Sequence, residues 1–452
     1  MTNAIGKIIR IVPRNRNVEL SLVLFAIALS AYELCQIQLS VIQVLRADIW
    51  QYLLPPAIAA LVIHVVLRFR ASEADPLLLP IAVALNGLGI AEIYRLDLAK
   101  EHLNNPQLFA GKQVVWTVIA MAIALLVIVF VKSHLFLRRF IYISMVIGVA
   151  LLLSPVLPLV GRTINGARLW LAIGGVTFQP GEIAKIALTI FFAGYLVSRR
   201  ESLAIVGRKI LWFQIPRARE LGPILLVWMV SLGVLVLERD LGTSLLYFGL
   251  FLVMIYVATG RAIYVVTGLG MFVTGALIAS RFMNYVQGRI SAWLDPFNPA
   301  NYNAVGGSYQ LAQGNFGLAH GSLLGTGLGG GLPQMVPVAE SDFIFSSLGE
   351  ELGLAGVFVI LVLYLLMVSR GLRIGFTHSD DFSKLLAAGL SFVIALQTFI
   401  VVGGVTRVVP LTGLTTPFLA AGGSSLLANW IIVGLLLRIS DSAGGQQRTV
   451  TL

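Results

Sequence analysis

Apolar residues dominate this chain in long uninterrupted runs rather than in alternating or amphipathic patterns. A helix that crosses about 30 Å of hydrocarbon needs roughly 17–25 such residues, and runs of this length recur along the whole sequence. We count twelve, over residues 19–45, 49–68, 76–95, 113–131, 137–159, 180–198, 222–238, 242–258, 262–280, 342–369, 384–406 and 416–437. The pattern therefore predicts about twelve transmembrane helices, and ten at least.

Helices fit these runs better than strands do. Strands of a transmembrane barrel alternate apolar and polar residues, and these runs are solidly apolar. A helix also satisfies its own backbone polar groups inside lipid. We therefore expect an all-α polytopic membrane protein, with residues 1–452 forming a single integral membrane domain. Composition agrees, because 58% of the residues are hydrophobic and only 12% are charged, against about a quarter charged in soluble domains.

The net charge of +11 could suggest nucleic acid, but Lys and Arg fall between apolar runs instead of clustering with aromatic residues. We expect no nucleic-acid partner and interpret the basic residues as topology signals. With a cytoplasmic N-terminus, 21 of the 32 basic residues lie inside and 10 outside, as the positive-inside rule requires. Residues 1–18 and 439–452 are thus predicted to be cytoplasmic tails, and residues 281–341 a large extracytoplasmic loop.

Several familiar signatures carry little weight in this sequence. Residues 325–330, GTGLGG, match a dinucleotide-binding motif, yet they neither follow a strand nor open a helix. Cys35 is the only cysteine, so no disulfide or cysteine metal site can form within the chain. The five histidines stand far apart without metal-ligand spacing. We expect any chemistry in the membrane-embedded core or on the outward loop.

Ionisable residues in or beside apolar runs are the informative ones, because a charge at mid-bilayer costs about 2.5–3.5 kcal/mol or more. Glu182 and Lys185 are three residues apart, on one face of a helix, and can pair. They form either a structural ion pair or a pair that faces a substrate. Asp240 follows Glu238 in a short outward connection, which is either a polar cluster at the outer edge or a solvated turn.

Further polar groups gather around the last three apolar runs. Glu350 and Glu351 lie about two turns into the tenth run, where acids are hard to explain structurally. Arg407 precedes a stretch with the hydroxyls of Ser424 and Ser425, and Arg suits two-pronged binding of a phosphate. These groups indicate an anionic substrate at the outer leaflet. The outward loop adds Asp295, in the unusually polar stretch RISAWLDPFNPANYNAVGGSYQLAQ.

Several of these stretches together resemble the SEDS family, whose members include RodA, FtsW and SpoVE. They are INGARLWLAIGGVTFQPGEIAK, LERDLGTSLL, GSLLGTGLGGG followed by ESDFIFSSLGEELG, and GLTTPFLAAGGSSLLAN. They occur in order over roughly residues 75–440, and several blocks together are far more specific than one. The stretch ADPLLLPIAVALNGLGIAEIYRLD makes the chain more similar to the actinobacterial RodA branch than to FtsW.

The resemblance implies a peptidoglycan glycosyltransferase that polymerises lipid II at the outer face of the cytoplasmic membrane, for elongation and cell shape. It implies a class B penicillin-binding protein as partner, beside lipid II and membrane lipids. Alternatives are an FtsW-like division polymerase, a lipid II flippase and a non-catalytic scaffold of the wall-synthesis complex. The expected substrate-binding residues are Glu182, Lys185, Asp240, Arg407, Ser424, Ser425, Glu350 and Glu351. A divalent cation is one candidate, beside Lys185 and Arg407, for stabilising the diphosphate.

The catalytic base is where the sequence departs from the family pattern. The family carries an Asp six residues before a Tyr-Gln pair, and the position six before Tyr309 is Asn303, which cannot accept a proton. Asp295, fourteen residues before Tyr309, is the nearest acid and our candidate base. Either an extended loop folds Asp295 into the base position, or another acid is the base, or the chain is catalytically weak.

Overall fold

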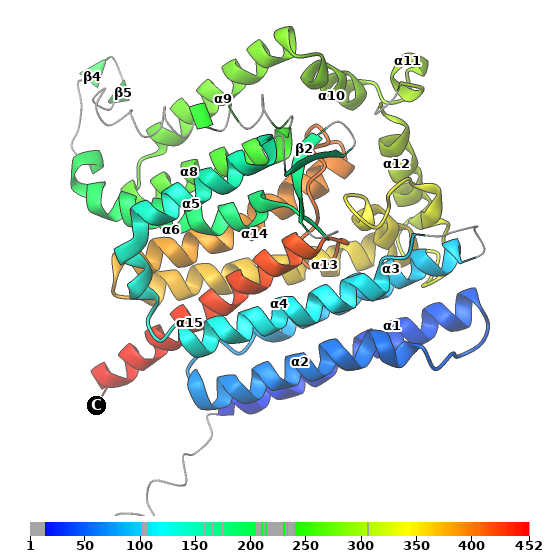
Figure 1. Cartoon of the computed structure of the whole chain (residues 1–452), viewed down its shortest axis with the longest axis horizontal. Helices are drawn as coiled ribbons and strands as arrows, with labels where there is room; N and C mark the ends of the chain where they lie inside the picture. Colours follow the sequence, from blue (N-terminus) through cyan, green and yellow to red (C-terminus); the bar gives the residue numbers. More distant parts are fainter. Residues whose placement is uncertain are drawn as a thin grey trace, which may run out of the picture.

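The structure, a computed structural model, is a bundle of long helices that run in roughly one direction (Figure 1). Eleven of the described helices are long and apolar enough to cross a membrane. The described residues are 14–101, 107–157, 160–164, 167–173, 176–204, 209–210, 213–214, 229–230, 233, 238, 240–304 and 307–451. Most of the predicted run 222–238 lies outside them, and the other eleven predicted runs each have a matching helix.

The long helices are α1 (Arg14–Val41), α2 (Ile49–Arg70), α3 (Leu78–Lys100), α4 (Ala110–Phe130), α5 (Ile141–Leu153), α6 (Pro180–Ala204), α8 (Leu241–Thr259), α9 (Ala262–Phe282), α13 (Ile344–Thr377), α14 (Asp381–Val405) and α15 (Gly423–Thr451). Shorter helices are α10 (Asn284–Leu294), α11 (Pro299–Tyr302), α12 (Tyr309–Gly321), η2 (His134–Phe140), η3 (Ser154–Val156) and η4 (Pro333–Met335). The predicted run 137–159 is thus η2, α5 and η3 together. The strands are β1 (Gly161–Ile164), β2 (Ala167–Ile173), β3 (Val176–Phe178), β4 (Lys209–Ile210) and β5 (Phe213–Gln214).

Burial separates central helices from peripheral ones. Helices α3, α14 and α15 are buried along most of their length, whereas only a small share of α5 and α9 is buried. The exposed side chains on the outer helices include large apolar ones such as Phe69, Phe130 and Phe282. An apolar exterior of this kind suits hydrocarbon and not water. The chain is therefore a multi-pass helical membrane protein, as the sequence predicts.

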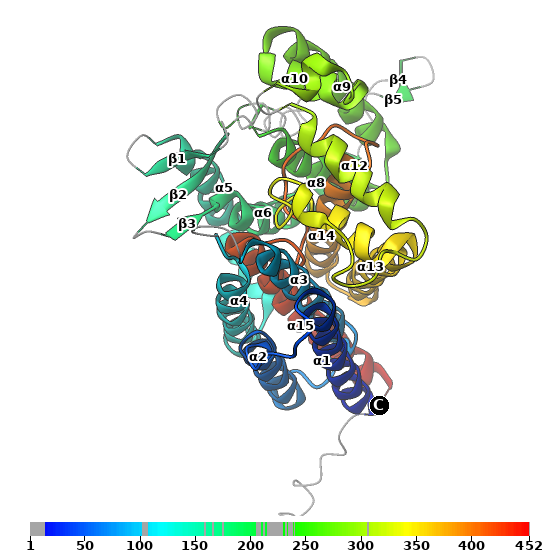
Figure 2. The ribbon, with the colours of Figure 1, turned by 90° about the vertical axis from the view of Figure 1, so that its right-hand side faces the viewer.

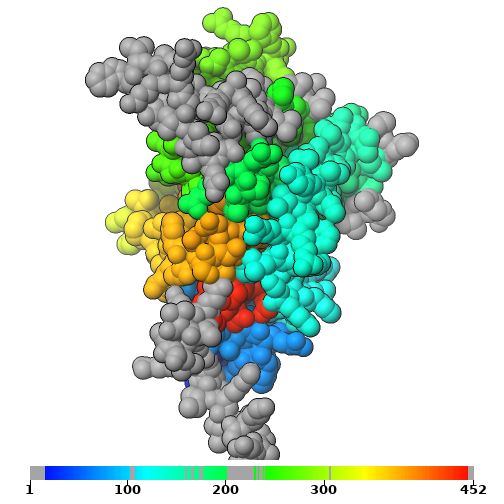
Figure 3. All heavy atoms as spheres, turned by 90° about the vertical axis from the view of Figure 1, so that its left-hand side faces the viewer, coloured from blue at the N-terminus to red at the C-terminus, as the bar shows by residue number. Residues whose placement is uncertain are grey.

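The start of α1 and the end of α15 lie at the same end of the bundle. The Arg16 guanidinium, near the start of α1, donates to the Ala74 carbonyl in the α2–α3 connection. The neighbouring Glu73 N–H donates to the Asp441 carboxylate of α15 at 3.1 Å. Figure 3 looks at this face, with α15 in red between the orange, cyan and blue helices. We call this face the terminal end and the opposite face the loop end.

Helical structure extends into both predicted tails. Helix α1 begins at Arg14, so the predicted tail 1–18 already contains helix, and Arg16 is fully buried against Glu19. Helix α15 continues through the predicted tail 439–452 as far as Thr451. A hydropathy count missed these extensions of α1 and α15 because they are rich in polar residues. Their side chains bind backbone groups of the neighbouring connections, as Arg438 does with the carbonyl of Val131 at 2.8 Å.

The loop end carries structure that the sequence did not predict. Strands β1, β2 and β3 form a small antiparallel sheet between α5 and α6, with Leu171 paired to Phe178. Figure 2, viewed from the loop end, shows this sheet projecting to one side of the bundle. Its last strand leads directly into Pro180, the first residue of α6. The segment between α9 and α13 also lies here, with α12 packed on α13.

Candidate functional site

A buried ion pair opens the first turn of α6. Pro180 begins the helix, where its missing N–H costs nothing. Glu182 and Lys185 are 4% and 1% exposed, and the Lys185 ammonium donates to the Glu182 carboxylate at 2.5 Å. The sequence left a structural pair and a substrate-facing pair open. In the structure the described residues around this ion pair enclose it, since both side chains are almost fully buried.

Two amides on other helices complete this cluster. The Lys185 ammonium also donates to the side-chain oxygens of Gln397 on α14, at 2.8 Å, and of Asn429 on α15, at 3.4 Å. The Asn429 amide in turn donates to the Ser425 hydroxyl at 3.3 Å. We call Glu182, Lys185, Gln397, Asn429 and Ser425 the lysine cluster. The sequence analysis missed Gln397 and Asn429, although an amide within a long apolar run was a signal that could have found them.

A non-helical segment before α15 forms one wall of the cluster. The predicted run 416–437 becomes helix only at Gly423, because residues 416–422 pass through the bundle without helical structure. Within this segment Thr416, Phe418 and Leu419 are almost fully buried. Irregular backbone is tolerated at membrane depth where protein surrounds it. The Thr415 carbonyl accepts a hydrogen bond from Gln397 at 2.9 Å, which ties the segment to the lysine cluster.

Hydroxyl groups line the two ends of this segment. The Ser424 hydroxyl accepts a hydrogen bond from the backbone N–H of Gln179, just before α6, at 2.9 Å. The hydroxyls of Thr415 and Thr416 are buried and have no partner among the described residues. Buried hydroxyls normally have hydrogen-bond partners. These two hydroxyls therefore have free hydrogen-bonding capacity among the described residues, and the sequence analysis did not single them out.

Asp240 caps the start of α8 and is buried. One carboxylate oxygen accepts from the N–H groups of Gly242 and Thr243, at 2.9 and 3.1 Å. The other oxygen is buried and has no partner among the described residues. Burial raises the pKa of Asp240, and the hydrogen bonds from Thr243 and Gly242 oppose that shift. Glu238 is buried as well, so the solvated turn that the sequence left open is wrong for these two acids.

Helices α6 and α8 are joined near the two acidic positions. The Tyr247 hydroxyl on α8 donates to the Gly181 carbonyl on α6 at 2.6 Å. This contact places the start of α8 beside the start of α6 at the loop end. No described hydrogen bond or ion pair links Asp240 to Lys185, so Asp240 lies near the lysine cluster without belonging to it.

Arg407 has no described contact with the lysine cluster, and its side chain binds backbone. Its guanidinium donates to the carbonyls of Trp293 and Leu294, at 3.1 and 3.3 Å, and its own carbonyl accepts from the Trp293 indole at 2.9 Å. These contacts attach the end of α10 to the end of α14. Arg407 therefore positions the residue that follows Leu294, which is Asp295.

Asp295 and Asn303 both lie exposed on one compact loop. The Asn301 amide closes it by donating to the carbonyls of Ser291 and Asp295, at 3.1 and 2.8 Å. The Asn303 amide donates to the carbonyl of Pro299 at 3.0 Å. No described contact joins the Asp295 carboxylate to the lysine cluster. The two positions thus share a loop, and Asp295 is the one that can accept a proton.

Glu350 and Glu351 form a second buried cluster with the glycine-rich segment. The Glu350 carboxylate accepts from the Leu332 N–H at 2.9 Å, and the Glu351 carboxylate accepts from the Gly329 N–H at 2.7 Å. Arg95 of α3 donates to the Glu351 carboxylate at 2.8 Å and to the Gly331 carbonyl at 2.7 Å. These contacts give both acids a structural role, and they explain the GTGLGG motif as a segment folded onto α13.

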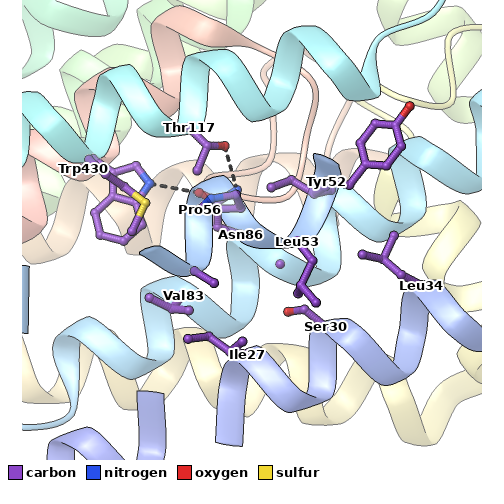
Figure 4. A pocket seen from close by; sticks show the side chains of 14 residues that line it. Ile27, Ser30, Leu34, Tyr52, Leu53, Pro56, Val83, Asn86, Thr117 and Trp430 are labelled. Carbon is purple, nitrogen blue, oxygen red and sulfur yellow. Dashed lines mark hydrogen bonds between the residues drawn. The ribbon is translucent and has the colours of Figure 1, made fainter. Parts of the chain in front are cut away.

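A third feature is an apolar cavity between α1, α2, α3, α4 and α15 (Figure 4). Three of its polar groups are joined to one another, since Asn86 donates to Thr117 at 3.3 Å and accepts from the Trp430 indole at 3.0 Å. Every member of the lysine cluster is absent from its lining. The cavity is therefore separate from the groups that could perform acid–base chemistry.

The divalent cation that the sequence analysis considered has no preformed binding site among the described residues. No three His, Cys, Asp or Glu side chains gather closely enough to hold a metal in the part of the chain that the structure describes. Metal sites for hard cations need several oxygen ligands together. We therefore derive no step through a metal ion.

The fold and these sites define a polytopic helical membrane protein whose lysine cluster, Asp240 and Asp295 loop lie at the loop end. A family model described as Cell cycle protein, covering FtsW, RodA and SpoVE, matches residues 76–444. The chain belongs to this family, the SEDS family that its sequence resembles.

Comparison with known relatives identifies the branch of the family to which the chain is most similar among those compared. Over 441 residues it is 44% identical to the Peptidoglycan glycosyltransferase RodA of Mycobacterium tuberculosis, covering 97% of this chain and 93% of the relative. It is 30% identical to a probable peptidoglycan glycosyltransferase FtsW of Trichlorobacter lovleyi, covering 82% of this chain and 94% of the relative. The similarity to the RodA branch that the sequence predicts is confirmed.

A solved structure has the same fold. It was reported as the structural coordination of polymerization and crosslinking by a peptidoglycan synthase complex. The TM-score is 0.64 at 25% identity, covering 82% of this chain and 98% of the other. A member of this fold therefore works within a complex that polymerises and crosslinks peptidoglycan.

Proposed function

We propose that this chain is a peptidoglycan glycosyltransferase of the RodA type, which polymerises lipid II into glycan strands for cell elongation. The observation that carries the proposal is the 44% identity, over 97% of the chain, to relatives with that activity in their name. The arrangement of the polar groups supports it, since the lysine cluster, Asp240 and the Asp295 loop all lie at the loop end.

The reaction sets requirements that these residues meet. The acceptor sugar's 4-hydroxyl attacks the anomeric carbon of the donor and loses its proton to a base, and the diphosphate leaves with the bonding electrons. Asp295 is the proposed base, because it is an exposed carboxylate that a membrane-bound substrate can reach. Lys185 is the proposed source of positive charge for the diphosphate, held in place by Gln397 and Asn429.

Arg407, Asp240 and the serines take supporting roles in this proposal. Arg407 positions Asp295 through the end of α10. Asp240 caps α8 with one carboxylate oxygen, and its other oxygen, which has no partner among the described residues, is proposed to serve the reaction. Ser424 and Ser425 follow the C-terminal end of the segment that walls the lysine cluster, where Ser424 binds the backbone before α6 and Ser425 binds Asn429. Glu350 and Glu351 act at a distance from the reacting atoms, by fixing the glycine-rich segment on α13.

We place the loop end outside the cell and both termini in the cytoplasm. The basic residues of the connections near the terminal end, such as Arg68, Lys132 and Arg138, support this orientation by the positive-inside rule. Lipid II would then meet the site on the outer face. The proposed partner is a class B penicillin-binding protein, supported by the polymerising and crosslinking complex that shares this fold.

The second candidate is a non-catalytic scaffold. Asn303 favours it, since Asn303 stands where the family carries its presumed base. To decide, we would purify the chain with its partner transpeptidase, add lipid II and separate the products by gel electrophoresis. A ladder of glycan polymer is expected from the wild-type protein, and none from Asp295→Ala.

Variants of the neighbouring position are matched controls. We expect Asn303→Ala to keep the activity of the wild-type protein, because it changes another exposed side chain of the same loop. Polymer from Asp295→Ala would remove Asp295 as the base. Failure of the wild-type complex to make polymer, with lipid II and a competent partner present, would favour the scaffold.

A further inference from the structure

Four buried acids on α1, α3 and α13 lie near enough to one another for Glu92 to experience the charge of the other three, although no contact joins them among the described residues. They are Glu33 on α1, Glu92 on α3, and Glu350 and Glu351 on α13. Glu92 is 1% exposed, and neither of its carboxylate oxygens has a hydrogen-bond partner among the described residues. One oxygen of Glu33 is also buried without a partner. Buried polar groups normally have partners, so two unsatisfied acids together require an explanation.

The basic side chains nearby already have partners. Arg95 donates to Glu351 and to the Gly331 carbonyl. His320 is within 2.9 Å of Glu350. Glu33 and Glu92 are therefore left without an opposite charge, and a bare carboxylate buried in this way is strongly disfavoured against its neutral form.

The surroundings point to a proton as the ligand. The charged groups facing Glu92 are Glu33 from α1, Arg95 from its own helix, and Glu350 and Glu351 from α13. The described contacts of α2, α4 and α15 with α3 include the neutral side chains of Tyr52, Thr117 and Trp430, and none of the charged groups that act on Glu92 comes from these three helices. A metal would need several ligands gathered around it, and no such group exists among the described residues. A proton needs only one carboxylate oxygen.

We propose that Glu92 is a proton-binding site in the membrane-embedded core, and that its bound proton keeps Arg95 on Glu351. Glu92 and Arg95 are three residues apart on one helix, so they share a face and can pair directly. While Glu92 holds its proton it offers Arg95 no charge, and Arg95 holds Glu351 and Gly331. Loss of the proton creates a competing carboxylate beside Arg95. The site is thereby linked to the glycine-rich segment.

Infrared spectroscopy tests the proton directly. A protonated carboxyl group has a C=O stretching band that a carboxylate lacks, so the spectrum of the wild-type protein minus that of Glu92→Gln should contain this band at neutral pH. Glu182→Gln is the matched control, because Glu182 is equally buried but paired with Lys185. Its difference spectrum should show carboxylate bands. Carboxylate bands from Glu92 would overturn the proposal.

Hydrogen–deuterium exchange tests the link to Arg95. After correction for intrinsic exchange, amides of residues 322–332 should exchange at least about threefold faster above the pH at which the Glu92 carboxyl band disappears. In Glu92→Gln this step should be absent. The same step in both proteins would overturn the link. Gln is a neutral isostere of the protonated acid, so failure of Glu92→Gln to fold would also contradict the proposal.

Discussion

Lys185 shows how one side chain can hold three helices together. It binds Glu182 on its own helix, Gln397 on α14 and Asn429 on α15. Removing one partner of a buried ion pair leaves the other charge uncompensated, which is more damaging than removing both. This asymmetry separates the structural role of the pair from its role in the reaction.

We therefore predict that Lys185→Met destabilises the protein by about 3–5 kcal/mol, because Glu182 stays buried and unpaired. The double variant Glu182→Gln with Lys185→Met should regain most of that stability and still fail to make polymer. Thermal unfolding and the polymer assay measure the two effects. Lys384→Met is the control, because its pair with Asp381 is exposed and should be worth at most about 1 kcal/mol. Full activity in the double variant would make the pair purely structural.

Asp342 allows a prediction about pH. Burial raises the pKa of this carboxyl, which lies just before α13, to about 6. The folded protein then binds a proton more tightly than the unfolded chain, so this group's contribution to stability falls as pH rises from about 4 to about 6.

Asp342→Asn removes that titration. Relative to the wild-type protein, the variant should become more stable as pH rises from 4 to 7, by at most about 3 kcal/mol. Unfolding midpoints measured at several pH values test this. Asn303→Ala changes no titratable group and should track the wild-type protein at each pH. A constant difference between Asp342→Asn and the wild-type protein would contradict the prediction.

At the scale of elements, α13 is two helices joined at a break. Gly353 has φ +69° and ψ −175°, a conformation outside the helical region. The freed carbonyls of Glu350 and Glu351 each accept a hydrogen bond at 3.0 Å, from the N–H groups of Thr326 and Gly327. The glycine-rich segment thus supplies the partners that a continuous helix would have provided.

Gly353→Ala should damage this junction. A Cβ atom there would lie 2.2 Å from the Gly325 nitrogen, in addition to the backbone strain, and we expect a loss of about 2 kcal/mol or more. Gly270→Ala on α9 is the control, since nothing lies within 4 Å of its added Cβ. Thermal unfolding compares the two. Equal midpoints for both variants would show that the break is not needed.

Substitutions of Asp240, at the start of α8, can separate its role as a helix cap from a role in the reaction. Asp240→Ala should lose the helix cap, at about 1 kcal/mol, whereas Asn is as good a cap as Asp. If the carboxylate itself serves the reaction, Asp240→Asn keeps stability and loses polymer formation. We expect Asp240→Asn to remain stable and to form no polymer, because one oxygen of Asp240 is buried without a partner among the described residues. Normal polymer formation by a stable Asp240→Asn would limit the residue to capping.

At the scale of the whole molecule, the two ends of the bundle should face opposite sides of the membrane. Cys35 is the only cysteine, so Cys35→Ser provides a background for single-cysteine labelling. In intact cells an impermeant maleimide should label Asn303→Cys and leave Thr377→Cys unlabelled until the cells are permeabilised. Both positions are exposed, and they lie at the loop end and the terminal end. The reverse pattern would invert the proposed orientation.

The sequence was most informative where the signal is local. Apolar run length located eleven helices that the structure describes, because spanning hydrocarbon depends on each segment by itself. The spacing of Glu182 and Lys185 likewise predicted their pairing, because both lie on one helix. The sequence misplaced the start of α15 and missed the sheet after α5. Hydropathy identifies segments that prefer hydrocarbon to water, but it does not show whether the backbone of such a segment is helical.

By itself, the sequence determined a multi-pass helical protein of the SEDS family, with its charged groups at the ends of particular helices. Only the tertiary structure decided which of those groups meet. It brought Gln397 and Asn429 to Lys185, directed Arg407 to the backbone of α10, and placed Glu351 against Arg95. These partners are separated by more than a hundred residues. The physical reason is that a buried polar group takes whichever partner packing brings within hydrogen-bond distance, and packing depends on all the helices together.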